Sequence, residues 1–220
     1  MKFKTELHCH CLEASACATI NAEQLTEIYV NAGYNSVVLS NHFEKGTKGI
    51  FKISDYQDYV TLFIDAFKKF KKVSEGKLNA IFGAELRFVD SVNDYLWFGA
   101  NEKFLRDNPD IFEMGITKFH QICKENGWLV VQAHPFRNGM KIMNPQDLDG
   151  VEVFNGHKGH DSRNFIAELW ADIYGLLKTS GTDLHYDYCP ANAGILTDTE
   201  MKSMDDLIEV IKNKKYELIK

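Results

Sequence analysis

The sequence predicts an α/β fold with a mainly parallel sheet, either a barrel or a doubly wound sheet. Seven short apolar runs recur along the chain, and amphipathic helical patterns separate many of them. Histidines and acidic residues follow several of these runs directly. With 220 residues, of which 45% are hydrophobic, the chain is expected to form one domain over residues 1–220. This composition excludes intrinsic disorder and collagen-like repeats.

The predicted strands are short and apolar at successive positions, as is typical of parallel strands that are buried on both faces. They cover residues 3–7, 36–39, 80–83, 95–99, 129–132, 151–154 and 176–179. The connections after residues 83 and 132 look too short for a full helix. The alternation of strands and helices is therefore expected to be irregular.

The predicted helices begin at capping residues that precede apolar positions three and four residues apart. These starts are Asn21, Ser54 with Gln57, Asp110, Asp161, and Ser203 with Asp206. The first helix is expected to stop at Gly33 and the third near Gly127, because glycine commonly ends helices. The apolar stripe of the fourth helix is Phe165, Leu169 and Ile173.

Charge and hydropathy argue against several classes of partner. The net charge of −6 disfavours binding to long nucleic acids, which normally requires a basic excess. No stretch approaches 18 consecutive apolar residues, so we expect no membrane-spanning helix and no membrane partner. The five cysteines are odd in number and no export signal is evident, which favours free thiols in a reducing cytoplasm. The oligomeric state is not indicated.

Potential metal ligands follow five of the seven predicted strands. They are His8 and His10, His42, Glu85, His134, and Asp183 with His185. In parallel α/β folds, ligands gather where strands end and loops begin. Side chains two residues apart on an extended chain share a face, so His8 and His10 can point to one site. Imidazole and carboxylate groups together suit zinc, manganese or iron.

At these residues the sequence resembles the PHP family, named for polymerase and histidinol phosphatase. The motifs are "TELHCH", "SNH", "GAE", "QAHP" and "GTDLH", in that order along the chain. The resemblance implies a distorted, TIM-like (β/α) barrel of seven strands with a metal site at the C-terminal ends of the strands. It also implies two or three divalent metal ions (zinc, manganese or iron) and phosphoester hydrolysis.

The resemblance also implies a distribution of ligands. The first metal would take His8, His10, Glu85 and Asp183, the second Glu85 and His134, and the third His42 and His185. Family members commonly supply a further histidine to the second metal just after the fourth strand, but residues 97–101 contain none. We therefore expect the second position to bind most weakly unless water, an anion or Asn101 completes it.

The third metal of the family commonly gains a ligand from the loop after the paired histidines. Glu13 is the only carboxylate in that loop, so it is the predicted ligand. Cys11 and Cys17 lie in the same loop and could bind a soft metal, but their neighbours favour oxygen and nitrogen ligands. His120, in the middle of a predicted helix, is interpreted as structural.

Four further residues are candidates for binding an anionic substrate. They are Arg137, Asn155, His157 and His160. A guanidinium group at Arg137 could bind a phosphate with two hydrogen bonds, although a surface salt bridge explains it equally well. Asn155, His157 and His160 follow the sixth strand, and a loop that is merely polar explains them equally well. Asp183 or His185 could transfer the proton.

The predicted function is hydrolysis of a small phosphorylated metabolite or nucleotide by a metal-activated water. A metal-dependent amidohydrolase is an alternative, but no lysine stands at the matching strand-end positions. A non-catalytic PHP-like module is a second alternative, and it should have lost several of the ligands that this chain retains. The substrate, and the choice between monoester and diester, cannot be deduced from the motifs.

Overall fold

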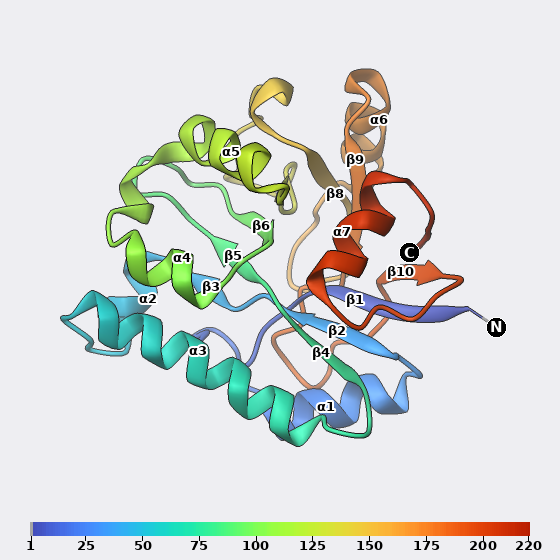
Figure 1. Cartoon of the computed structure of the whole chain (residues 1–220). Coiled ribbons are helices and arrows are strands. Elements are labelled where there is room, and N and C mark those ends of the chain that lie inside the picture. Colours follow the sequence, from blue (N-terminus) through green and yellow to red (C-terminus); the bar gives the residue numbers. More distant parts are fainter. Residues whose placement is uncertain (1) are drawn as a thin grey trace.

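The computed structural model describes residues 2–220 and forms an α/β fold with two mixed sheets (Figure 1). The first sheet has the strand order β11-β10-β1-β2-β4. Its strands are β1 (Phe3–Cys9), β2 (Ser36–Leu39), β4 (Asn79–Phe82), β10 (Gly194–Thr197) and β11 (Glu217–Ile219). Strands β1, β2 and β4 are parallel, whereas β10 is antiparallel to β1.

The second sheet has the strand order β3-β5-β6-β7-β8-β9. Its strands are β3 (His42–Phe43), β5 (Ala84–Leu86), β6 (Tyr95–Phe98), β7 (Leu129–Gln132), β8 (Gly150–Asn155) and β9 (Leu177–Gly181). Strand β6 is antiparallel to both β5 and β7, and the other pairs are parallel. All seven predicted strands are therefore present, and β3, β5, β10 and β11 are additional.

The two sheets are joined where a strand of one sheet continues almost directly into a strand of the other. Only residues 40–41 separate β2 from β3, and only Gly83 separates β4 from β5. A Cβ atom at Gly83 would lie 2.5 Å from a methyl carbon of Val38, so the close approach at this junction requires glycine. The α/β fold that the sequence predicted is confirmed, but a distorted barrel of seven strands is not, because the strands divide into two sheets and β6 is antiparallel to its neighbours.

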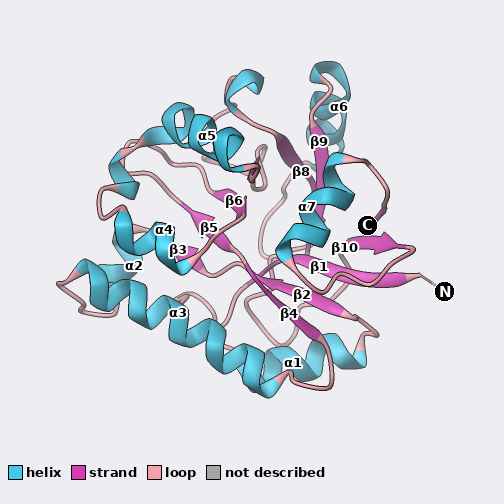
Figure 2. Ribbon diagram, viewed as in Figure 1, coloured by secondary structure: helices cyan, strands magenta, loops and turns pink. Residues whose placement is uncertain are grey.

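The helices lie outside the strands (Figure 2). They are α1 (Ala22–Asn31), α2 (Lys45–Ile50), α3 (Tyr56–Val73), α4 (Glu102–Asp107), α5 (Gly115–Asn126), α6 (Asn164–Tyr174) and α7 (Met204–Lys212), with short 3-10 helices at Ile111–Glu113 and Pro145–Asp147. The predicted helix starts at Asn21 and Ser203 are confirmed, and both residues form capping boxes. Gly127 ends α5 in a left-handed conformation, as expected.

Three predicted helix starts differ in detail. The cap of α3 is Asp55 rather than Ser54, because the Asp55 carboxylate accepts from two backbone N–H groups of the first turn. The segment after Asp110 first forms a short 3-10 helix, and α5 begins at Gly115. The N-cap of α6 is Arg163, whose backbone N–H donates to Asp161.

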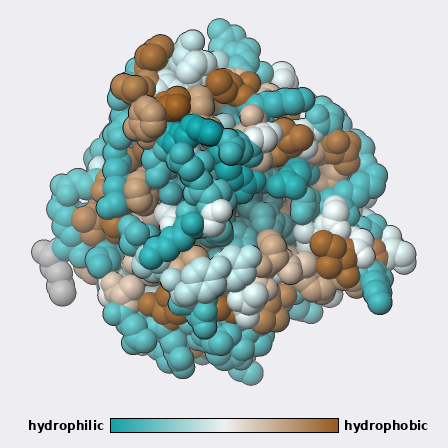
Figure 3. Space-filling model, turned by 180° about the vertical axis from the view of Figure 1, so that it is seen from behind, coloured by the Kyte–Doolittle hydropathy of each residue, from teal (hydrophilic) through white to brown (hydrophobic). Residues whose placement is uncertain are grey.

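Helix α6 packs against the protein through the face opposite to the apolar stripe that the sequence indicated. Its buried residues are Ala167 and Ala171, whereas Phe165, Leu169 and Ile173 are 68%, 59% and 72% exposed. Hydrophobic residues are correspondingly visible at the upper left of Figure 3, where α6 lies when the view of Figure 1 is turned. The small alanines allow close packing on β8, which explains why the larger residues point outward. Within residues 2–220, no helix combines the length and the apolar character needed to cross a membrane.

Candidate metal centre

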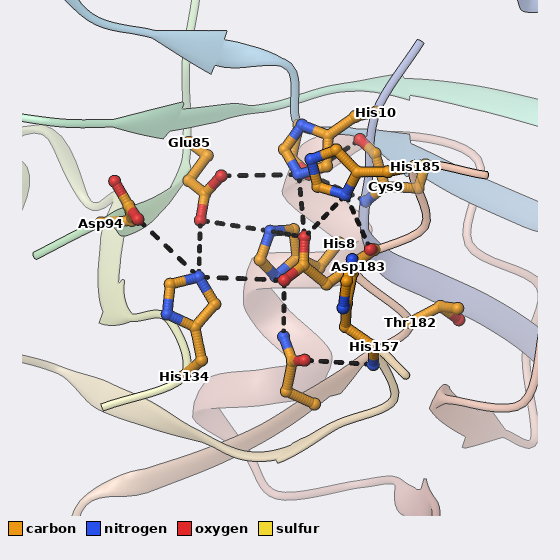
Figure 4. A network of polar contacts seen from close by, with 12 residues as sticks. His8, Cys9, His10, Glu85, Asp94, His134, His157, Thr182, Asp183 and His185 are labelled. Carbon is orange, nitrogen blue, oxygen red and sulfur yellow. Dashed lines mark hydrogen bonds and ion pairs between the residues drawn. The ribbon is translucent and has the colours of Figure 1, made fainter. Parts of the chain in front are cut away.

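The end of β1 supplies two histidines to a buried polar cluster between the sheets (Figure 4). The side chains of His8 and His10 are fully buried. Cys9, between them, packs in a separate hydrophobic cluster with Leu25 and Tyr29 of α1. This alternation follows from extended backbone geometry, and it confirms that His8 and His10 share a face.

Glu85 of β5 lies at the centre of the cluster and contacts four imidazole rings. Its Oε1 lies 3.2 Å from Nε2 of His8 and 3.3 Å from Nε2 of His134. Its Oε2 lies 3.4 Å from Nε2 of His10 and 2.8 Å from Nδ1 of His42. The carboxylate therefore has one oxygen toward each of two possible ion positions, as expected of a bridging ligand.

Asp183 completes the first position from the segment after β9. Its Oδ1 lies 3.4 Å from Nε2 of His8 and 3.3 Å from Nε2 of His10. Its backbone N–H donates to the carbonyl of His8, which holds the two segments side by side. His8, His10, Glu85 and Asp183 are thus brought together as the sequence predicted.

The donor geometry fits a divalent cation. Two donors about 2.1 Å from an ion in tetrahedral geometry lie roughly 3.4 Å apart, and the distances among these four residues match that value. Nε2 of His8, Nε2 of His10 and both oxygens of Glu85 are buried without a hydrogen-bond partner among the described residues. Buried polar atoms are normally satisfied, so these unpartnered nitrogen and oxygen atoms fit a site for a cation.

Charges within the cluster shift the pKa values of its groups in different directions. Burial acts to lower the pKa values of His8 and His42, but Asp183 and Glu152 beside His8 and Glu85 beside His42 hold them well above the ordinary value, so these two rings would release a proton when a cation binds. Burial alone would raise the pKa of Glu85, but positive charge on His8 and His42 holds it well below its usual range. Burial, together with the neighbouring His185 and His42, holds the pKa of His10 well below its ordinary value. An ionised carboxylate and a neutral imidazole are the forms that bind metal.

The second position has a carboxylate that the sequence analysis missed. Because β6 runs antiparallel to its neighbours, its start rather than its end faces the cluster. Asp94 stands at this start, and its Oδ2 lies 3.8 Å from Nε2 of His134. Asn101, at the other end of β6, instead caps α4 by accepting from the N–H of Phe104. Asn101 is therefore not placed to complete the second position.

Arg87 holds Asp94 in this place. Its guanidinium donates two hydrogen bonds to the Asp94 carboxylate, at 2.6 Å from Nε and 2.7 Å from Nη2. Asp94 is almost fully buried, and one of its oxygens lies within 4.8 Å of ligand atoms on both His42 and Glu85. The motifs did not indicate this carboxylate, which lies beside the ring of His134.

The third position is built from His42 and His185, but Glu13 is not part of it. Glu13 accepts a hydrogen bond from the N–H of Ala22 and forms an ion pair of 2.8 Å with Lys69 of α3. The structure therefore does not bring Glu13 to the cluster, because Lys69 pairs with its carboxylate, and its role as a ligand stays a prediction.

A second layer of acceptors orients the ligands, and the sequence analysis missed its main member. Oε1 of Glu152 in β8 lies 2.9 Å from Nδ1 of His8, while its Oε2 accepts from the backbone N–H of His134. The amide of Asn155 donates to Glu152 and to Asp183. Such carboxylate–histidine contacts fix the tautomer that presents Nε2 to a metal. Asn155 therefore supports the cluster, and its predicted contact with substrate stays a prediction.

Glu6 of β1 holds the two chain segments that carry the first ligands. Its Oε1 accepts from the backbone N–H groups of Leu7, His8 and Thr182, at 2.9–3.0 Å. Its Oε2 accepts from the hydroxyls of Tyr29 and Thr182. Burial raises the pKa of Glu6 to about 7, although these hydrogen bonds act in the opposite direction.

The remaining predicted residues lie at the rim of the cluster. Arg137 has one guanidinium nitrogen 3.5 Å from Asp94 and another 3.5 Å from His160. The rings of His157 and His160 stack with centroids 4.4 Å apart, and Nε2 of His160 lies 3.8 Å from Asp183. The structure thus brings Arg137, His157 and His160 beside the ligands, on partly exposed loops. His120 lies elsewhere, buried in α5 with its Nε2 3.3 Å from Asp149.

Comparisons with known proteins support the fold. No protein-family model matches the chain, and its sequence has no significant match among curated proteins. Solved structures do match it. A two-domain protein from Bacteroides vulgatus, named as containing a predicted PHP-like metal-dependent phosphoesterase, matches 99% of this chain with a TM-score of 0.68 and 14% identity. This chain spans 64% of that protein's length.

Two further structures show the same relationship. PsfC from Pseudomonas syringae matches 94% of this chain and 88% of its own, with a TM-score of 0.70 and 13% identity. The lesion-specific endonuclease PfuEndoQ from Pyrococcus furiosus matches 99% of this chain and 58% of its own, with a TM-score of 0.69 and 11% identity. At the level of the fold, the resemblance to PHP-like metal-dependent phosphoesterases that the motifs predicted is confirmed.

Proposed function

We propose that this protein is a metal-dependent phosphoester hydrolase acting on a small phosphorylated molecule. The observation that carries the proposal is the set of orphaned, fully buried donors around Glu85, spaced as ligands of a cation are spaced. The likeness in fold to structures named as phosphoesterases and an endonuclease supports it. The net charge of −6 favours a small substrate over a long nucleic acid.

Two or three divalent ions would occupy the cluster. His8, His10, Glu85 and Asp183 would hold the first, and Glu85, His134 and Asp94 the second. Such ions lower the pKa of a coordinated water and neutralise charge on phosphoryl oxygens. Oε2 of Glu85 lies 3.4 Å from Nε2 of His10 and Oε1 lies 3.3 Å from Nε2 of His134, which supports a shared role for Glu85.

The protein's own residues would orient the ester and move the proton. Arg137, 23% exposed at the rim, is placed to form paired hydrogen bonds with phosphoryl oxygens. Asp183 or His185 would take a proton from the attacking water, and for His185 the accepting atom would be Nε2. Nδ1 of His185 is already 2.9 Å from a backbone carbonyl, to which it must donate. The stacked rings of His157 and His160 would shape the entrance beside Asp183.

The test is turnover of an aryl phosphate monoester and an aryl phosphate diester by the full chain. The protein is first stripped with a chelator and then reloaded separately with Zn²⁺, Mn²⁺ or Fe²⁺. We expect hydrolysis after reloading with at least one ion and none in excess chelator. Full activity of the metal-free protein, or no turnover of either ester after any reloading, would overturn the proposal. The relative rates on the two esters decide between phosphatase and phosphodiesterase.

A further inference from the structure

One face of α6 is apolar and open to solvent (Figure 3). Phe165, Leu169 and Ile173 are each more than half exposed, and Tyr174 beside them is 49% exposed. No other part of residues 2–220 covers this face. With side chains of this size, the patch measures on the order of 400–500 Å². A patch of this extent is comparable with the largest one on a typical monomer, which often serves as an interaction surface.

The helix that carries this patch is firmly attached to the rest of the protein. Its opposite face packs on β8 through the buried Ala167 and Ala171. At its start, the guanidinium of Arg163 donates to the carbonyl of Phe136 at 2.6 Å. The ring of Trp170 packs against that of Phe136, with centroids 6.2 Å apart. A surface that is already rigid loses little conformational entropy when a partner binds, which favours association.

The acidic residues of α6 are neutralised within the chain. Asp172 forms an ion pair of 2.6 Å with Lys178, and Glu168 forms one of 2.5 Å with Lys220. Two copies of α6 could therefore face each other without net repulsion between these groups. An anionic membrane surface fits this face less well, because α6 carries two carboxylates and no lysine or arginine.

The exposed apolar residues recur every four positions, a pattern that can pack against a copy of itself. A twofold axis through Leu169 would place the helix of a second copy antiparallel to the first. Leu169 would then meet its own counterpart, and Phe165 would lie beside Ile173 of the partner subunit. Rows of side chains four residues apart are the ridges that most commonly interlock when two helices pack. The patch is therefore complementary to itself.

We propose that α6 forms the core of a symmetric homodimer interface, whose partner is a second copy of this chain. The patch supplies about half of the surface, roughly 800 Å², that each subunit buries in a stable dimer. The polar surface around α6 would supply the rest, since interfaces commonly have an apolar core and a polar rim. A twofold interface is closed, so assembly would end at two copies. None of the four apolar residues belongs to the metal cluster, and the inference is independent of the proposed function.

The test is sedimentation equilibrium of the full chain from about 1 to 100 μM, a range that reveals dimers of moderate affinity. We expect a species of twice the 25.2 kDa chain mass. Leu169→Lys and Leu169→Glu should each be monomeric, because like charges would meet at the twofold axis. Mixed in equal amounts, these two variants should recover association, since opposite charges then meet. Ile50→Lys, at a similarly exposed residue of α2, is the control and should remain dimeric.

The substitutions at Leu169 should leave the fold unchanged, because this side chain is exposed, and circular dichroism of each variant checks it. A dimer that persists in Leu169→Lys would contradict the inference, since association would then use another surface. A mixture as monomeric as its two components would contradict the twofold arrangement. An unmodified chain that stays monomeric over the whole range would also contradict the inference, and a different protein would be left as the occupant of this face.

Discussion

Oε1 of Glu152 lies 2.9 Å from Nδ1 of His8, while Oε1 of Glu85 lies 3.2 Å from Nε2 of the same ring. The His8 imidazole is therefore held between two carboxylates, one that orients it and one that would share a metal with it. The other oxygen of Glu152 accepts from the backbone N–H of His134. A single side chain thus orients ligands of both the first and the second metal positions.

We predict that Glu152→Gln weakens metal binding by about 10- to 100-fold, which is typical of lost outer-shell carboxylates. The amide nitrogen of glutamine would place a donor against N–H groups from which Glu152 now accepts hydrogen bonds. Competition titration with a chromophoric chelator measures the effect. Glu209→Gln, at an exposed position of α7, is the control. Unchanged affinity in Glu152→Gln would show that His8 needs no orienting partner.

Removing a ligand of the first position should abolish hydrolysis but preserve the fold. We expect Asp183→Ala and His10→Ala each to lose at least a thousandfold in kcat and to keep native circular dichroism. Bound metal stabilises the folded state by mass action, so the melting temperature of the metal-loaded protein should also fall. His120→Ala is a poor control, because His120 is buried beside Asp149, and the exposed Lys118→Ala replaces it. Near-normal turnover of either variant would contradict the ligand assignment.

Asp94 should determine how firmly the second position binds. We predict that Asp94→Asn lowers the affinity of the weakest ion about tenfold and leaves the tightest ion unchanged, because His8 and His10 remain in place. Asp94→His should restore the affinity, since imidazole is also a good ligand. Metal stoichiometry at limiting free ion, measured by elemental analysis, distinguishes these outcomes. Equal loss of all ions would mean that the variant disturbs the fold through Arg87.

Glu6→Gln should destabilise the protein without removing any ligand. The amide nitrogen of glutamine would face donors from Thr182, Tyr29 and the backbone of β1, and one buried group would lose its partner. Leaving one buried polar group without a partner costs about 1–3 kcal/mol, which corresponds to a fall in Tm of roughly 2–12 °C for a chain of this size. Differential scanning calorimetry of the metal-free protein measures it. A change below about 2 °C would contradict this role.

The thiol of Cys17 should react at unusually low pH in the metal-free protein. Burial acts to raise its pKa, but hydrogen bonds with His185 and His42 outweigh burial and lower the pKa to about 6. The thiolate is the reactive form, so the alkylation rate should be nearly maximal at pH 7 and fall as the pH decreases through 6. Iodoacetamide labelling across this range, read by mass spectrometry, gives the profile. A half-maximal rate near pH 8.5, as for a free cysteine, would contradict it.

Local patterns were sufficient to predict the seven main strands and the ligands that follow them. Burial of parallel strands imposes runs of apolar residues, and His8 and His10 share a face because strand geometry alternates. The direction of β6 could not be deduced, since apolar runs look the same in parallel and antiparallel strands. Asp94 was missed for that reason, because it precedes an apolar run instead of following it.

Long-range contacts decided the other differences. Glu13 lies in the loop after the paired histidines, and only the contact with Lys69 of α3 shows that its carboxylate points away from the cluster. Glu152 sits inside the apolar run of β8, where alternation alone assigned no role to it. In α6 the apolar stripe indicated the wrong face, since two alanines pack closely on β8.

The position of Glu85 between the two sheets has a mechanical consequence. His8 and His10 belong to β1 in one sheet, whereas Glu85 and His134 come from β5 and the end of β7 in the other. A cation bound among them would link the two sheets directly. Metal binding and the packing of the two sheets against each other would then be a single equilibrium. Chelation should therefore increase amide hydrogen exchange at the ends of β1 and β5 before it affects the outer helices.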